Sequence, residues 1–261
     1  MKKLIAVLLA AICIVTCFAG CGKKNDTLVM ATNAAFPPYE YKEGNDFAGI
    51  DVEIATAIAE KLGKKLEIAD VEFGSIIGGV QTGKYDFGMA GMTVTDERKE
   101  SVNFSDTYAT GIQSVIVLAD SEYKSFEDFY TGFDADGNPS GVKDGIKIGV
   151  QQDTTGDIYS SDDPAKWGFG DENVVRYKTG ADAVQALLTK KVTAVIIDNE
   201  PAKSFVSSNE GLKILDGEYT NEDYAICVAK ENTELLDQIN KALSELKQAG
   251  KIDEIIGKYI K

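Results

Sequence analysis

Strand-like and helix-like segments alternate along almost all of this 261-residue chain, and this alternation limits its fold more than any other feature. The clearest helix is expected over 49–62, where isoleucine recurs every four positions and Gly63 follows as a stop. Apolar runs predict strands over 27–32, 66–71, 86–90, 113–118, 146–151, 192–197, 212–215 and 224–229. Further helices are expected over 75–82, 95–101, 125–129, 181–189, 200–207, 233–249 and 252–259. We therefore predict an α/β fold with parallel sheets and helices on both faces, whose ligands bind beyond the carboxyl ends of strands.

The sequence contains no histidine, which limits its chemistry. Ser–His and Cys–His nucleophile pairs are excluded, and so are most zinc and haem sites, which use histidine as a ligand. The 42 acidic residues outnumber the 27 basic ones, and the net charge of -15 would repel nucleic acid. We expect neither a metal nor a cofactor, no nucleic-acid partner, and binding rather than catalysis.

The first twenty residues are typical of a secretory signal peptide rather than of the fold. Two lysines precede an apolar run that is slightly short for a membrane span. The segment Phe18-Ala19-Gly20-Cys21 looks like a bacterial lipoprotein cleavage site, although Phe18 departs from the usual leucine. We expect cleavage after residue 20, a lipid on Cys21 and a polar linker over 21–26. The alternative is an uncleaved membrane anchor.

Cleavage there would leave 25 basic against 42 acidic residues, a net charge of -17. It would also remove two of the four cysteines. Because Cys21 would carry the lipid, Cys227 would have no disulfide partner. Its apolar neighbours predict a buried thiol that packs as a small hydrophobic side chain.

Two stretches in the second half are expected as loops, 131–145 and 160–173. The first contains Asp134-Ala-Asp136-Gly-Asn138, which faintly resembles a calcium-binding loop. However, Pro139 stands where such a loop needs glycine, and Gly145 where it needs glutamate. A solvated turn is therefore favoured over a metal site.

Polar residues that could hold a free amino acid follow several of the expected strands. Gly91 and Thr93 come after the strand 86–90, and Arg98 lies in the first turn of the next helix, where it could bind a carboxylate. Thr154 and Thr155 follow the strand 146–151 and could direct backbone N–H groups at an anion. The alternative for both segments is an ordinary capped surface helix.

An acid and several aromatic residues complete this set. Asp198 ends the apolar strand 192–197, where it could bind an ammonium group or cap the following helix. Phe36 and Tyr39 flank two prolines after the first strand, and Phe73 begins another loop. Such rings could enclose a ligand side chain or belong to the core.

Together these segments resemble the polar amino-acid-binding proteins of bacterial ATP-driven (ABC) importers, which form solute-binding protein family 3. The resemblance runs from about residue 28 to residue 259, and the block GMTVTDERK is its most specific part. The other matching segments are TNAAFPPYE, FAGIDVEIATAIAEKLG, VEFGSIIGGVQTGKYDF, VNFSDTYA, IKIGVQQDTTGD, AVQALLTKKVTAVIIDNEPA and LSELKQAGKIDEIIGKYI.

The resemblance implies a two-lobe periplasmic-binding-protein-like fold of type II, with two hinge crossings near 110–113 and 215–219. Lobe 1 would comprise 27–112 and 217–261, and lobe 2 would comprise 113–216. The protein would act as a monomer at the outer face of the cell membrane. It would close on a free amino acid and deliver it to the permease subunits of an ABC importer.

The resemblance also assigns roles to residues of this chain. Arg98 and Thr93 would bind the ligand carboxylate together with the N–H of Thr155, in the turn that contains Gln152 and Thr154. Asp198 and the Gly91 carbonyl would bind the ammonium, and Phe36 and Phe73 would form the walls. Two positions depart from the pattern. Asp153 stands where the turn usually has glycine and is expected to face solvent. Asn33 stands where several relatives have aspartate, and it suits a polar ligand side chain better than a purely cationic one.

Two rival functions follow from the same resemblance. Some relatives are dehydratases of cyclohexadienyl acids, which need a general acid in the cleft. Without histidine, the candidates for that role are Glu40, Glu200 and Asp153. The other rival is a sensory module that reports amino acids to a membrane receptor.

Overall fold

The computed structural model describes residues 26–217 and 220–260. The expected signal peptide, Cys21 and the linker up to residue 25 lie outside these residues. Within the described part of the chain, no helix is both long and apolar enough to cross a membrane.

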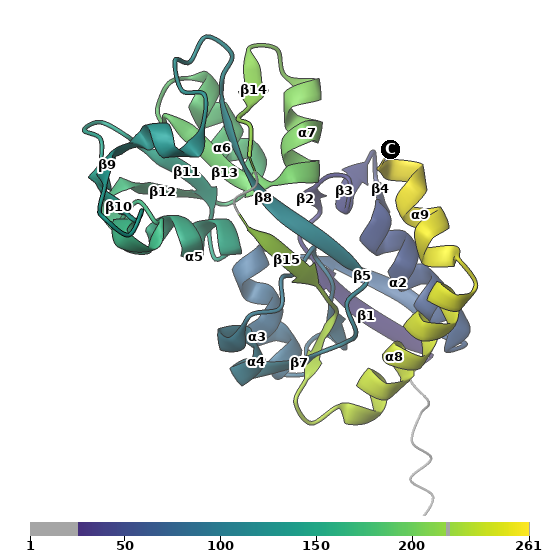
Figure 1. Ribbon diagram of the computed structural model, residues 1–261. Coiled ribbons are helices and arrows are strands. Elements are labelled where there is room, and N and C mark those ends of the chain that lie inside the picture. The colour runs from purple at the N-terminus through teal and green to yellow at the C-terminus, as the bar shows by residue number, and fades with distance from the viewer. Residues whose placement is uncertain (1–25, 218–219, 261) are drawn as a thin grey trace, which may run out of the picture.

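Lobe 1 is built around a sheet whose described strands have the order β5-β1-β6-β16-β7. Their bounds are Lys65–Asp70, Thr27–Thr32, Phe87–Gly88, Cys227–Ala229 and Val102–Phe104. Strand β1 runs parallel to β5 and β6, whereas β16 is antiparallel to β6 and β7. Helices α2 (Ile50–Lys61), α8 (Thr233–Gln248) and α9 (Lys251–Tyr259) lie together on one side of this sheet (Figure 1). Met30 packs with α2 and α8, and its neighbour Ala31 packs with α3 (Ile76–Gln81), so both faces of the sheet are covered.

Lobe 2 is built around a sheet with the order β12-β11-β13-β8-β14. Their bounds are Val174–Tyr177, Ile148–Gln151, Ala194–Asp198, Ala109–Leu118 and Leu212–Ile214. Strand β11 is parallel to β12 and β13, while β8 is antiparallel to β13 and β14. Helices α6 (Gly180–Leu188) and α7 (Asn199–Ser208) contact this sheet, as does α5 (Thr155–Ser161). The α/β prediction is therefore confirmed, with sheets that are parallel in part and antiparallel where later strands join.

Two strands connect the lobes, as Figure 1 shows for β8 and β15 (Asn221–Tyr224). They pair antiparallel, with Asn221 opposite Ile112 and Tyr224 opposite Ala109. The crossing expected near 110–113 lies inside β8. The second crossing expected near 215–219 includes residues 218 and 219, which lie outside the described residues; before it the N–H of Leu215 bonds to the Val115 carbonyl of lobe 2, and after it β15 begins at Asn221. The single strand expected over 224–229 is split into β15 and β16, since the chain leaves the hinge and enters the lobe 1 sheet.

The stretch 131–145, expected as a loop, forms a hairpin of β9 (Tyr130–Phe133) and β10 (Pro139–Val142). The Asp134 carboxylate accepts the N–H groups of Asp136 at 2.9 Å and Asn138 at 2.8 Å, which closes the turn. The stretch 160–173 contains two short 3-10 helices, Pro164–Lys166 and Asp171–Asn173. Aromatic contacts that short-range patterning does not predict hold this region, since the Phe169 ring stacks on Tyr130 at 5.4 Å.

The sequence patterns do not predict one small sheet, whereas two short expected helices are present with slightly different bounds or type. A small antiparallel sheet forms from β2 (Ala35–Phe36), β3 (Glu40–Glu43) and β4 (Asp46–Ala48). The expected helix over 125–129 is a 3-10 helix (Phe126–Phe129), and α4 spans Asp96–Ser101. Cys227 is buried as predicted and forms no disulfide within the described part of the chain, and burial raises the pKa of its thiol to about 12.

Candidate functional site

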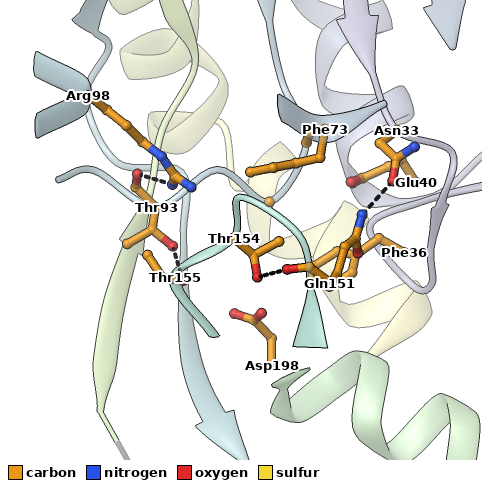
Figure 2. Close-up of a pocket in the computed structure, with 12 residues that line it drawn as sticks. Asn33, Phe36, Glu40, Phe73, Thr93, Arg98, Gln151, Thr154, Thr155 and Asp198 are labelled. Carbon is orange, nitrogen blue, oxygen red and sulfur yellow. Dashed lines mark hydrogen bonds between the residues drawn. The ribbon is translucent and has the colours of Figure 1, made fainter. Parts of the chain in front are cut away.

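A pocket lies between the lobes, beyond the carboxyl ends of β1, β6, β11 and β13 (Figure 2). The cavity has a volume of about 20 Å³, room for about one water molecule, so a larger molecule enters only when the lobes part. Its lining residues are Asn33, Phe36, Glu40, Phe73, Ala90, Gly91, Thr93, Arg98, Gln151, Thr154, Thr155 and Asp198. Polar and aromatic groups of both lobes therefore surround this space, and a polar molecule bound there would contact both lobes.

Arg98 lies on the first turn of α4, where Thr95 caps the helix by accepting the Arg98 N–H at 3.1 Å. The side chain is only 7 % exposed. Its Nη1 donates to the Thr93 carbonyl at 2.8 Å, and its guanidinium lies 5.2 Å from the centre of the Phe73 ring. Among the described residues no carboxylate lies within 4.0 Å of it. Burial lowers the pKa of Arg98, as expected for a cation without a counter-ion.

Threonines surround the guanidinium on both lobes. The hydroxyls of Thr93 and Thr155 lie 3.4 Å apart across the cleft. The Thr154 hydroxyl donates to the Gln151 carbonyl at 2.8 Å and caps α5. Thr155 is therefore the first residue of α5, where a backbone N–H has no partner within the helix. Hydroxyl and N–H donors thus gather beside Arg98, as an anionic group requires.

Asp198 ends β13 and lines the pocket from lobe 2. The Tyr224 hydroxyl, from the hinge strand β15, donates to its Oδ1. Glu222 of the same strand is also buried and accepts a hydrogen bond from Gln113 Nε2 at 2.9 Å. Burial, and then the neighbouring Glu222 carboxyl, raise the pKa of Asp198 to about 8. A cation at this carboxylate would favour its ionised form.

A second pair of acids supports the pocket from lobe 1. Asp51, in the first turn of α2, accepts the Gly91 N–H at 2.8 Å and the Tyr108 hydroxyl at 2.8 Å. Glu40 is 1 % exposed and lines the pocket, and its carboxyl shares a hydrogen bond with that of Asp51. Burial, and then the charge of Asp51, raise the pKa of Glu40. Gly91 has φ +50, and a Cβ there would lie 2.9 Å from the Phe36 ring, so this position favours glycine.

Aromatic and amide groups also line the pocket: Phe73 lies next to the Arg98 guanidinium, whereas Phe36, Asn33 and Gln151 lie at the end away from Arg98 in Figure 2. Phe36 and Phe73 both line the pocket, as expected for its walls. Gln151 Nε2 donates to Asn33 Oδ1 at 2.8 Å, and Asn33 Nδ2 donates to the Val71 carbonyl at 2.8 Å. This amide pair joins the lobes and limits the length of a ligand side chain.

Nine of the ten residues predicted for the site line the pocket, and Gln152 does not. Gln152 is exposed, and its neighbour Gln151 points into the cleft instead. The chain turns sharply after Gln151, so only the last residue of β11 is directed inward. Asp153 is exposed, as expected. Glu40, Ala90 and Gln151 line the pocket without having been predicted as ligand residues.

The sequence profile described as bacterial extracellular solute-binding proteins, family 3, matches residues 28–261. The arginine-binding extracellular protein ArtP of Bacillus subtilis (strain 168) is 33 % identical over 269 residues, which cover 99 % of this chain and 98 % of ArtP. An ancestral arginine-binding protein bound to arginine is 37 % identical, with a TM-score of 0.79, and the match covers 90 % of this chain and 99 % of that one.

A third comparison is the ancestral amino acid-binding protein AncCDT-1, described as a precursor of cyclohexadienyl dehydratase. It is 30 % identical with a TM-score of 0.78, and the match covers 91 % of this chain and 97 % of that one. The profile match and the similarity to ArtP agree with the two-lobe fold and its interlobe pocket. The chain belongs to family 3 of the bacterial extracellular solute-binding proteins.

Proposed function

We propose that this protein binds a free amino acid between its lobes and delivers it to the permease of an ABC importer. One observation carries the proposal: Arg98 is buried at the pocket with no carboxylate of the described chain beside it. A buried cation is costly unless an anion pairs with it. The α-carboxylate of a ligand supplies that anion, and the donors of Thr93 and Thr155 supply further hydrogen bonds.

Asp198 supports the other half of the proposal. Its carboxyl lies on the opposite lobe from Arg98 and lines the same pocket. A ligand that carries both a carboxylate and an ammonium group would be bound by one lobe at each end. Such a ligand stabilises the closed form, because it contacts both lobes only when they meet.

Glu40 supports a polar or cationic side chain for the ligand. Its carboxyl, which shares a hydrogen bond with Asp51, lines the pocket, and the amides of Asn33 and Gln151 lie at the same end. Glu40 thus places a polar carboxyl group at the end of the pocket where Asn33 provides an amide. The similarity to ArtP, which is named for arginine, points the same way.

A thermal-shift screen of the twenty amino acids with ornithine and cystine tests this function. Protein freed of co-purified ligand by unfolding and refolding should be stabilised by arginine, ornithine or glutamine. It should be stabilised much less by leucine or valine, whose side chains offer no hydrogen bond to the Glu40 carboxyl or the amides. Absence of stabilisation by every amino acid would contradict the proposal.

The affinity for the amino acid should depend on pH through Asp198. Because the ligand ammonium favours the ionised carboxylate, binding lowers the pKa of Asp198 from about 8. Affinity should therefore rise from about pH 6 to about pH 8, by at most about tenfold per pH unit. Isothermal titration calorimetry at several pH values measures this slope. The Glu222→Gln variant should show a shallower slope, because a neighbouring charge is lost, and an affinity that falls over this range would refute the role of Asp198.

We further propose that the mature protein begins at Cys21, carries a lipid there and lies at the outer face of the cell membrane. The apolar run before Cys21, the Ala19-Gly20 pair and the extracellular nature of the family support this. We also propose that lobe 1 comprises 27–112 and 217–261, that lobe 2 comprises 113–216, and that the protein is a monomer. The Cys21→Ala variant should fractionate away from membranes, whereas the Cys227→Ala variant should stay with them. Equal fractionation of the two would contradict the anchor.

Glu40 is also the residue that makes the dehydratase alternative testable. Among the three candidate acids, Glu40 lines the pocket, while Glu200 pairs with Lys203 at 2.7 Å and Asp153 is exposed. Its raised pKa would allow it to donate a proton at neutral pH. Incubation with arogenate or prephenate would reveal turnover, and we expect none. The sensory alternative predicts a sensor kinase gene beside this one, whereas transport predicts genes for a permease and an ATPase.

A further inference from the structure

The turn that leads into α5 holds Asp153 in an unfavourable conformation. Asp153 has φ 64, in the left-handed region where a side chain costs about 1 kcal/mol or more. The family resemblance leads one to expect glycine at this position. Other contacts must therefore hold the turn in this shape.

Two charged residues of lobe 2 supply these contacts. The Asp157 carboxylate accepts the Asp153 N–H at 3.0 Å, and its side chain is 8 % exposed. Arg176 Nε, on β12, binds both oxygens of Asp157 at 2.9 and 3.0 Å. The Arg176 guanidinium thus holds one side of the Asp157 carboxylate, and this carboxylate holds the turn through the Asp153 N–H.

Lobe 2 reaches Arg98 through the Asp153 turn. Arg98 Nη2 donates to the Asp153 carbonyl at 3.1 Å across the cleft. The Asp153 side chain also lies against Gly74 of lobe 1, where an added Cβ would be 2.1 Å from its Oδ2. Because the Thr93 carbonyl accepts from Nη1, two carbonyls from different lobes hold the guanidinium.

We propose that Asp157 and Arg176 are positioning residues of the carboxylate site: they hold the Asp153 carbonyl against Arg98 and so orient its guanidinium toward the ligand as the lobes close. This inference rests on the proposed function, since it concerns how the same site binds its carboxylate.

Through Arg176, the stretch 160–173 would also contribute to the binding of the ligand carboxylate. Asp171 contacts Arg176 Nη2 at 2.6 Å, and the Ser161 hydroxyl contacts the same nitrogen at 2.8 Å. Ser161 is the last residue of α5, and Asp171 belongs to the region between α5 and β12. This region therefore supports Arg176 from the side away from the pocket.

A double-mutant cycle measured by calorimetry tests the proposal, with the amino acid that stabilises the wild-type protein most as the probe. Arg176→Gln should weaken binding about tenfold. Arg98→Lys keeps a charge but has no second guanidinium nitrogen to bond to Asp153. In the Arg98→Lys background the Arg176 substitution should therefore cost less than about twofold. Equal costs in both backgrounds would show that Arg176 does not act through Arg98 and would overturn the proposal.

Two further variants keep the test decisive. Lys166→Gln is the matched control, because Lys166 forms a surface ion pair with Asp162 in the same region, and it should leave affinity unchanged. If Arg176→Gln fails to fold, Asp171→Asn replaces it, since its side chain is 74 % exposed. That variant should also weaken binding, by a smaller factor, and lose its effect in the Arg98→Lys background. If the wild-type protein binds no amino acid, the proposed function fails. If it binds and the costs add, only this inference fails.

Discussion

Replacing Arg98 with alanine is expected to weaken the binding of the amino acid by about 2–5 kcal/mol, at least about thirtyfold. The ligand carboxylate would then be buried without its cation, and the surrounding donors of Thr93 and Thr155 cannot neutralise its charge. Isothermal titration calorimetry of ligand-free protein measures the loss directly.

Lys99→Ala is the control for this substitution. Lys99 is the next residue on α4, and it pairs at the surface with Asp96 at 3.0 Å. Its removal changes the net charge by the same amount but leaves the pocket intact, so affinity should stay within about twofold of the wild type. If both variants bind equally well, Arg98 does not bind the carboxylate.

Replacing Gly49 with alanine is expected to have the largest effect on stability. Gly49 has φ +122, and an added Cβ would lie 2.2 Å from the Tyr39 carbonyl oxygen and 2.8 Å from that of Pro38. Both carbonyls also accept N–H groups at the start of α2, from Asp51 at 2.9 Å and Ile50 at 3.1 Å. Because both contacts are backbone, neither can move away cheaply.

We expect Gly49→Ala to lower the free energy of unfolding by about 3 kcal/mol or more, since it combines strain with a backbone clash. Urea unfolding followed by circular dichroism measures this change. Gly63→Ala serves as the control: Gly63 has φ +65 after the same helix, but a Cβ there would meet no atom within 4 Å. Gly63→Ala should lower the free energy of unfolding by clearly less than Gly49→Ala. Equal losses would show that the clash with residues 38–39 does not cause the effect.

The sequence patterns predict the two charged ends of the site because both depend on local order. Arg98 lies in the first turn of the helix that follows a strand, and Asp198 is the last residue of an apolar strand, so both lie on the side of the carboxyl ends. The alternation of strands and helices then brings these ends to one cleft. Local patterns are sufficient for this part of the site.

The remaining residues depend on contacts between distant segments. Glu40 is buried by the turn that packs residues 36–39 against α2, and Tyr224 reaches Asp198 from the hinge. Gln151 rather than Gln152 enters the pocket because the left-handed Asp153 fixes where the chain turns. The hairpin of β9 and β10 depends on rings from three separate segments, among them Phe126 and Trp167. None of these contacts leaves a periodic signal in the sequence.

A crystal structure of the protein with the amino acid that stabilises it most would test the central claim directly. The ligand carboxylate should lie within about 3.2 Å of the Arg98 guanidinium, and its ammonium within the same distance of the Asp198 carboxylate. A ligand bound with its carboxylate away from Arg98, or in another cavity, would contradict the claim.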